Sequence, residues 1–264
     1  MSIKELASER ALVFFHLPKT GGTTLHHHFS VHFEPEEICP ERHSNLNAYS
    51  VDELRQWRFF SGHFNADEVK RIPRSVFLVT VFRDPIERLL SLYYFWKRHK
   101  YEYIEQKHME ALKITKDGTL IDFLRSDHPH ILRERVNGMT RQMAGAISMM
   151  ADGYALMKDG DQMAFLSEAQ LFNRALETLL SFDVIGDIAQ LKDVYRRVAG
   201  VFGMAPLTEV ARLNTRESEN QMMDPYTPET ITPEIWSLLE ENTRLDRILY
   251  QLARDHWRRG FLKA

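Results

Sequence analysis

Two short segments of the sequence carry the residue types that bind phosphate groups. The first, Pro18-Lys-Thr-Gly-Gly-Thr-Thr24, lies between an apolar run and a helical pattern, where backbone N–H groups and the positive helix end hold oxyanions. Its glycines permit close backbone approach, its last two threonines add hydroxyl donors, and its lysine adds a mobile positive charge. The residues that we expect to hold an anion here are Lys19, Thr20, Gly21, Gly22, Thr23 and Thr24.

The order of residues in this loop differs from a Walker A loop. In that pattern a Gly-Lys pair follows an earlier glycine, whereas Lys19 precedes both glycines of this loop. A glycine-containing turn that is flanked by lysine and threonine and binds no anion is the alternative interpretation.

The second segment, Arg83-Asp-Pro-Ile-Glu-Arg-Leu-Leu-Ser91, follows another apolar run, and Pro85 stands where a helix would begin. Arg83 at the strand end and Ser91 two turns into the helix are placed to converge on one phosphate, the arginine as a bidentate fork and the serine as a hydroxyl donor. Arg88 shares this helix face, and either a salt bridge with Asp84 or a ligand contact fits its position. Two anion sites at one sheet edge suit a nucleotide with two separate phosphates.

Transfer of a group from a bound nucleotide to a hydroxyl needs a general base, and twelve histidines compete for this role. His63 follows a short apolar run and Gly62, so we expect it to project from a strand end toward the phosphate loops; a structural histidine that caps a turn is the alternative. His16, directly before the first loop, is the second candidate, or is simply hydrogen-bonded. The four histidines at positions 26, 27, 28 and 32 suggest a solvated helix face rather than a metal site, and we expect no metal.

Buried strands must position these residues. Ala11–Phe15 and Val76–Phe82 are unbroken apolar runs, as in strands buried on both faces, and each passes through a proline-containing loop into a helical pattern. Weaker strands are expected at Arg58–Gly62 and at Phe182–Ile185. The pattern predicts an α/β fold, a P-loop-like parallel sheet flanked by helices, in one domain over residues 1–264.

Three further segments are assigned from local patterns. Apolar spacing indicates a helix at about Met163–Leu180 and a single helix from Pro233 to before Gly260, with Thr232 as its N-cap. Lys97–Arg135 is charged and rich in histidine, and Glu209–Pro233 is polar with three prolines. We expect loops or a substrate-facing lid in these two stretches.

The first loop, with its Pro-Lys-Thr-Gly-Gly-Thr-Thr core, resembles the 5′-phosphosulfate loop of sulfotransferases that use 3′-phosphoadenosine 5′-phosphosulfate (PAPS). The closest likeness is to the carbohydrate group with heparan sulfate and uronyl 2-O-sulfotransferases. The resemblance implies a sulfotransferase fold, Lys19 as a catalytic residue at the bridging oxygen of the donor, and Arg83 and Ser91 at the 3′-phosphate. It also places a catalytic histidine in a Gly-His segment between the two motifs, where His63 falls.

The same family has a segment similar to Asn137-Gly-Met-Thr-Arg-Gln-Met-Ala-Gly145, which brings Asn, Arg and Gln side chains near donor or acceptor. By this resemblance Arg141 binds an acidic sugar or the sulfuryl group; an arginine on the helix surface is the alternative. We expect Arg141 and His16 to contact substrate, and the acceptor to be a hydroxyl of a carbohydrate or glycoconjugate. A P-loop-type small-molecule kinase and a non-catalytic nucleotide-binding module are the competing functions.

Composition limits the class of protein. The 34 Lys and Arg residues nearly balance 37 Asp and Glu residues, for a net charge of −3, so any anion site is a local cluster and a nucleic-acid partner is not expected. A single cysteine, Cys39, and an N-terminus without a basic and apolar signal pattern favour a reducing, cytoplasmic location, unlike the Golgi members of the family. The apolar runs are shorter than the roughly 20 residues that span a bilayer, so we expect no integral membrane segment.

Overall fold

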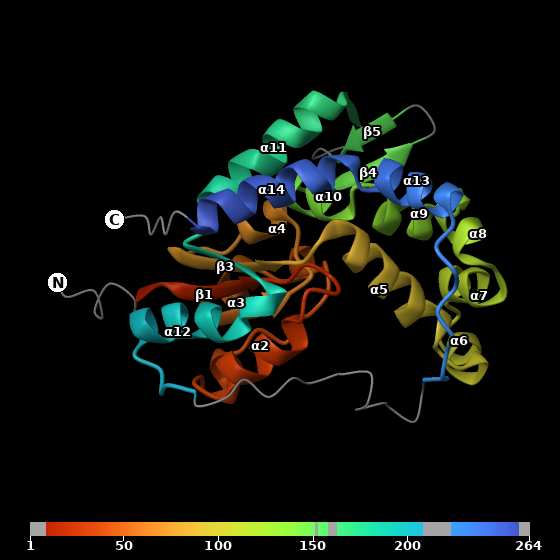
Figure 1. Cartoon of the computed structure of the whole chain (residues 1–264). Coiled ribbons are helices and arrows are strands. Elements are labelled where there is room, and N and C mark those ends of the chain that lie inside the picture. The colour runs from red at the N-terminus through yellow and green to blue at the C-terminus, as the bar shows by residue number, and fades with distance from the viewer. Residues whose placement is uncertain (1–8, 151–152, 158–162, 208–222, 259–264) are drawn as a thin grey trace.

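The computed structural model describes residues 9–150, 153–157, 163–207 and 223–258. A four-stranded parallel sheet with the order β2-β1-β3-β7 forms its centre (Figure 1). Its strands are β1 (Ala11–Phe15), β2 (Phe59–Gly62), β3 (Val76–Phe82) and β7 (Val184–Asp187). The predicted α/β class with a parallel sheet flanked by helices is therefore confirmed, and β1 and β3 have the predicted bounds.

Helices cover both faces of this sheet, as Figure 1 shows. One face carries α2 (Gly22–Ser30) and α12 (Leu191–Phe202). The other carries α10 (Gly138–Ala144), α11 (Glu168–Ser181) and α14 (Arg244–Arg258). The two-sided burial of the strands explains why their sequences are unbroken apolar runs.

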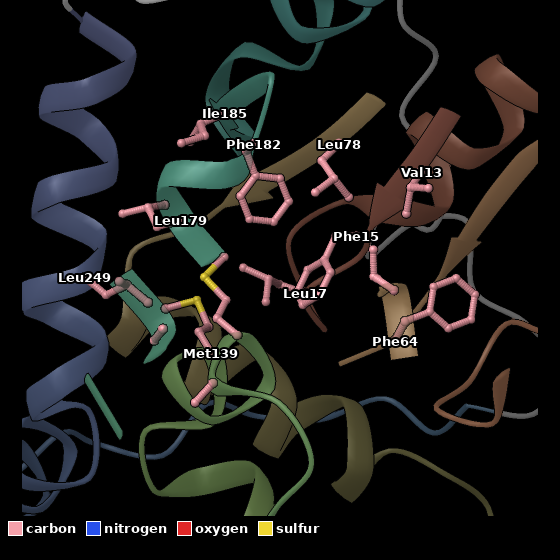
Figure 2. Close-up of a cluster of buried hydrophobic side chains, with 14 of the residues drawn as sticks. Val13, Phe15, Leu17, Phe64, Leu78, Met139, Leu179, Phe182, Ile185 and Leu249 are labelled. Atoms are coloured by element: carbon pink, nitrogen blue, oxygen red, sulfur yellow. The ribbon is translucent and has the colours of Figure 1, made fainter. Parts of the chain in front are cut away.

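Alternate residues of β1 pack into separate cores. Val13 and Phe15 join Leu78, Phe182 and Leu249 on the side of α11 and α14, and Figure 2 shows these side chains together with Met139 of α10 between the sheet and the helices. Leu12 and Phe14 point to the other side, where they meet residues of α2 and α12. This period of two is the geometry of a strand buried on both faces.

The stretch Lys97–Arg135, expected as loops or a lid, is mostly helical. It folds against helix α5 (Pro85–Lys97) around a third apolar core that includes Leu89, Phe123 and Leu239. The remaining helices of the described chain are α3 (Val51–Gln56), α4 (Ala66–Val69), α6 (Tyr101–Gln106), α7 (Glu110–Asp117), α8 (Leu120–Arg125), α9 (Pro129–Arg135) and α13 (Pro233–Asn242). The other stretch, Glu209–Pro233, lies largely outside the described residues.

A second, three-stranded antiparallel sheet was not predicted. It consists of β4 (Ile147–Met150), β5 (Gly153–Leu156) and β6 (Ala164–Leu166) and lies beside α10 and α11. The prediction of a helix from Met163 was therefore wrong in its first residues. Helix α11 begins at Glu168 because the Ser167 hydroxyl accepts a hydrogen bond from the Gln170 N–H, which is a capping box.

The C-terminal helix is divided in two, where one helix was expected. α13 ends at Asn242 and α14 begins at Arg244. The side-chain oxygen of Asn137 accepts hydrogen bonds from the N–H groups of Leu245 (2.8 Å) and Asp246 (3.4 Å) and so caps the new helix. Among the described residues, no helix is long and apolar enough to cross a membrane.

Candidate active site

A cavity of about 1100 Å³ opens at the carboxyl ends of the central strands. β1 leads into His16 and the first loop, β2 into His63, and β3 into Arg83, and all of these residues line the cavity. Ligands of open parallel sheets bind at this edge. Of the residues predicted from sequence, the lining includes His16, Lys19, Gly21, Gly22, Thr23, Thr24, His63, Arg83, Ser91 and Arg141.

Thr20 is the predicted residue that the cavity lining lacks. Its side chain is fully buried, and its hydroxyl donates to the carbonyl oxygen of Leu17 at 2.8 Å. The Thr20 side chain therefore stabilises the loop from inside, and a contact of Thr20 with an anion would use its backbone N–H.

The backbone of the first loop is bent where the sequence suggested. Lys19 and Gly21 have left-handed φ angles of 69° and 82°, and Gly21 is the N-cap of α2. A non-glycine residue in this conformation is uncommon and occurs where a site holds it in place. The first residues of α2 line the cavity, so the positive end of the helix dipole lies at the cavity, as expected of an anion site.

The ammonium of Lys19 lies 3.8 Å from the centre of the Phe95 ring in α5. Burial, with the charges of Arg83 and Arg98 nearby, lowers the pKa of Lys19 to about 8. A cation–π contact of this kind offsets part of the cost of burying the ammonium. Phe95 was not singled out from sequence, although its position four residues after Ser91 puts both side chains on one face of the helix.

Arg83, which belongs to the second predicted anion site, also contacts the first loop. Its Nη1 atom lies 3.5 Å from the Lys19 carbonyl oxygen and its Nε atom 3.4 Å from a Glu87 carboxylate oxygen. Ser91 lines the same cavity from α5. The helix begins at Pro85, because the side chain of Asp84 accepts hydrogen bonds from the two N–H groups that follow Pro85.

His63 is held in a defined orientation. Its Nδ1 atom lies 2.9 Å from the carbonyl oxygen of His16, and its backbone N–H donates to the Arg42 carbonyl oxygen at 3.0 Å. A carbonyl oxygen only accepts, so Nδ1 carries the proton and Nε2 is the basic nitrogen. Burial lowers the pKa of His63 below its ordinary value, so the ring is neutral near pH 7.

His16 supports His63 with its ring as well as with its carbonyl group. The two ring centres lie 4.3 Å apart, and the pKa of His16 is lowered well below its ordinary value by burial and by His63. The His16 ring also packs on the first loop, since a β-carbon added to Gly22 would lie 2.0 Å from it. The neutral His16 ring is therefore packed between His63 and the first loop.

Helix α10 brings Arg141 and Gln142 to the same cavity. Arg141 is 4% exposed; its Nε atom donates to the Val136 carbonyl oxygen at 3.1 Å, while Nη1 has no hydrogen-bond partner in the described chain. The Gln142 amide donates to the carbonyl oxygens of His16 (3.2 Å) and Phe64 (2.8 Å). Gln142 thus fixes the chain on both sides of the base, and Arg141 is a buried cavity residue, not a surface arginine.

Arg88 takes neither of its two predicted roles. It is fully buried, and its Nη2 atom donates to the Glu134 carbonyl oxygen at 2.7 Å, while the Asp84 side chain is used as a helix cap. Arg88 also acts electrostatically on Asp246, a buried carboxylate that accepts hydrogen bonds from Thr140 at the start of α10. Arg88 therefore supports the walls of the cavity without lining it.

The solvated histidine face that was expected forms only in part: His27 is exposed, whereas two other histidines of α2 pack against the protein. His28 is buried, and His26 stacks on Phe59 with ring centres 5.6 Å apart. Within the described ranges, no group of three or more His, Cys, Asp or Glu side chains is placed to hold a metal ion.

Two positive side chains meet in this cavity. Lys19 and Arg83 lie close enough for each charge to affect the other, and Lys19 forms no salt bridge with the carboxylates of the described residues. The loop at the start of α2 offers N–H groups beside them, and Ser91 adds a hydroxyl. Lys19, together with Arg83, whose carboxylate partner Glu87 is largely exposed, is suited to bind a polyanion.

Comparison with known proteins agrees with this chemistry. The model of the family described as "Sulfotransferase family" matches residues 6–259. A protein-tyrosine sulfotransferase of Arabidopsis thaliana is 33% identical over 95 residues, which are 35% of this chain and 19% of that protein. The chain therefore spans about a fifth of the length of this curated relative. The family match implies PAPS as the sulfate donor and confirms the predicted enzyme class: the chain belongs to the sulfotransferase family.

Proposed function

We propose that this protein transfers the sulfuryl group of PAPS to a hydroxyl of a carbohydrate or glycoconjugate, with His63 as general base. The observation that carries the proposal is the position of His63. Its Nδ1 atom is engaged by the His16 carbonyl oxygen, and its ring lines the same cavity as Lys19, Arg83 and Ser91.

The donor supplies the sulfuryl group, and the two anion sites of the chain hold its ends. Gly21, Gly22, Thr23 and Thr24 at the start of α2 would bind the 5′-phosphate, because N–H groups and hydroxyls meet there. Arg83 and Ser91 would bind the 3′-phosphate. Lys19 would stand at the bridging oxygen, where its charge stabilises the negative charge that develops on the leaving phosphate.

His63 would remove the proton of the acceptor hydroxyl with Nε2. The ring is neutral near pH 7 because burial lowers its pKa, and a neutral imidazole is the form that accepts a proton. Glu134 lines the cavity, and its charge opposes this lowering of the pKa, so it favours the imidazolium that proton transfer creates. His16 is next to the base and would contact substrate with the edge that reaches the cavity.

Arg141 would contact the acceptor. Its guanidinium lines the cavity, and burial lowers its pKa to about 10, which leaves it charged near pH 7. Arg133 of α9 lines the cavity as well. Two arginines near the base suit an acceptor with an acidic group close to the reacting hydroxyl, as in an acidic sugar.

A second acceptor class is the phenol hydroxyl of tyrosine. The similarity to a plant protein-tyrosine sulfotransferase favours it, although the match covers about a third of this chain. A screen with PAPS labelled in the sulfuryl group, offered neutral and acidic glycans, glycolipids, phenols and tyrosine peptides, separates the two. We expect label in a glycan or glycolipid. Label in tyrosine peptides alone would replace the carbohydrate proposal.

The donor proposal has its own test. Calorimetry of the purified protein with 3′-phosphoadenosine 5′-phosphate and with ATP should show binding of the first nucleotide and much weaker binding of the second. Tight binding of ATP alone would favour a kinase. Tight binding of the bisphosphate without transfer to any acceptor would favour a non-catalytic nucleotide-binding module.

A further inference from the structure

The second sheet has one face that packs against the core. Ile147 and Tyr154 are buried there, and Met149, Leu156 and Leu166 pack against the same apolar cluster. The cross-strand pairs Ile147↔Leu156 and Met149↔Tyr154↔Leu166 confirm that these residues share one face. The residues between them lie on the opposite face, where Ala155 of the middle strand is fully buried beneath its neighbours and the larger side chains are exposed.

The outward face of this sheet is apolar. The pairs Ser148↔Ala155↔Phe165 and Met150↔Gly153 form it. Met150 is 40% exposed and Phe165 is 56% exposed, whereas the outer face of an antiparallel sheet is ordinarily polar. No described residue of this face is charged, and an exposed apolar patch of this kind commonly marks a binding surface.

The apolar face continues into the wall of the candidate active site. The N–H of Met157 donates to the Ala146 carbonyl oxygen at 2.9 Å, which extends the ladder by one residue and keeps Met157 on the outer face. Met157 is 52% exposed, and it lines the cavity together with Ala146 and Ser148. A molecule in the cavity can therefore contact the edge of this face through Met157.

We propose that the acceptor is amphiphilic: its hydroxyl-bearing head occupies the cavity and an alkyl or acyl chain lies on the outer face of the β4–β5–β6 sheet. This inference rests on the proposed function for the role of the head group. Methionine side chains suit such a chain because they are flexible and polarisable. An anionic membrane surface is disfavoured as the occupant, since the described residues of this face include no lysine or arginine.

Binding of matched glycosides tests the inference without any turnover. Octyl β-D-glucoside, kept below its critical micelle concentration, and methyl β-D-glucoside are titrated into the full-length protein with 3′-phosphoadenosine 5′-phosphate present. We expect the octyl compound to bind about tenfold more tightly, the gain when roughly two methylene groups leave water. Equal affinities would overturn the inference.

The double variant Met150→Gln/Phe165→Gln places polar groups on the face and changes no residue of the cavity lining. It should lose the octyl preference and keep the affinity for the methyl compound and for the bisphosphate nucleotide. Leu180→Gln is the control, because Leu180 is 52% exposed near the end of α11 and should leave the preference intact. If the double variant does not fold, Met150→Gln alone is compared. We then expect the affinity ratio of the octyl to the methyl compound to fall from about tenfold to about threefold.

Other occupants give different results. Binding of wild-type protein to phosphatidylcholine vesicles without an octyl preference, or a dimer in sedimentation that the double variant abolishes, would overturn the inference in favour of a membrane or a second copy. An octyl preference that survives in the double variant would also overturn it. Failure of the proposed function shows separately, as absence of label transfer to every acceptor while the binding difference persists.

Discussion

The Nδ1 atom of His63 lies 2.9 Å from the carbonyl oxygen of His16, the residue that leads into the phosphate loop. The contact fixes the tautomer of the base, because only a protonated Nδ1 can donate to a carbonyl oxygen. The Gln142 amide donates to the same oxygen at 3.2 Å, so the base, the loop and α10 meet at one atom. The position of the base is thereby tied to the position of the donor site.

The rate should depend on pH in a bell-shaped way. Burial lowers the pKa of His63 below 6.5, so the base stays neutral and active down to that pKa, and the acid limb should lie below pH 6.5. The pKa of Lys19 is about 8, so its charge is lost as the pH rises through that value. We therefore expect kcat/KM for the donor to be highest between the pKa of His63 and the pKa of Lys19, and to fall at lower and at higher pH.

Initial rates at low donor concentration between about pH 5 and pH 9 measure this profile. A Lys19→Arg variant is the control, because arginine stays charged over this range and should lose the alkaline limb. An acid limb centred above pH 7 would contradict the assignment of a buried, neutral His63.

Replacement of Lys19 by alanine should raise the barrier for transfer by about 2.7–4 kcal/mol, or roughly 100- to 1000-fold in rate. The physical reason is the loss of the positive charge at the bridging oxygen, where negative charge develops. Single-turnover rates with labelled donor measure this loss, and thermal unfolding checks that the fold is retained. A Lys19→Ala enzyme with the normal rate would remove Lys19 from the mechanism.

Gly22→Ala should disturb the base through His16. The added β-carbon would lie 2.0 Å from the His16 ring, so the ring must move, at a cost of about 1–3 kcal/mol in the free energy of unfolding and with a loss of transfer activity. Chemical denaturation and the transfer assay measure both effects.

Gly200→Ala is the matched control within α12. A β-carbon there has no neighbour within 4 Å, so the change should stabilise the helix by about 0.5–1 kcal/mol and leave activity as it is. If Gly22→Ala, in contrast to the prediction, also keeps its transfer activity, the position of the His16 ring is not needed for transfer.

Arg83→Gln should weaken binding of 3′-phosphoadenosine 5′-phosphate by roughly 10- to 100-fold, because a charged hydrogen-bond donor to a phosphate is lost. Binding of adenosine 5′-phosphate, which lacks the 3′-phosphate, should change little. Calorimetry with both nucleotides gives this comparison within one variant. An equal loss for both would place Arg83 at the 5′-phosphate instead.

The sheet and the phosphate loop are readable from sequence because their signals are local. Val76–Phe82 is apolar throughout, since both faces of β3 are buried, and Lys19 and the glycines stand directly at a strand end. The carboxyl ends of parallel strands meet at one edge, and this alone brings His63 and Arg83 into the same cavity.

The elements that sequence missed depend on distant contacts. The start of α14 is set by the Asn137 side chain, which lies more than 100 positions earlier in the sequence. Arg88 is buried and donates to the Glu134 carbonyl oxygen instead of pairing with its sequence neighbour Asp84. β4–β6 are strands of three or four residues whose pairing gives no clear periodic signal. The start of α11 was missed although the sequence contains its signal. Ser167 and Gln170 have the spacing of a capping box, which marks the first turn of a helix.

The transfer rate of a His63→Ala variant tests the central claim most directly. Wild-type protein, His63→Ala and the control His27→Ala, at an exposed position of α2, are compared with sulfuryl-labelled PAPS and the acceptor that the screen identifies. We predict a loss of roughly 100- to 10,000-fold in His63→Ala, with the affinity for 3′-phosphoadenosine 5′-phosphate retained and His27→Ala fully active. Transfer by His63→Ala at the wild-type rate would contradict the account.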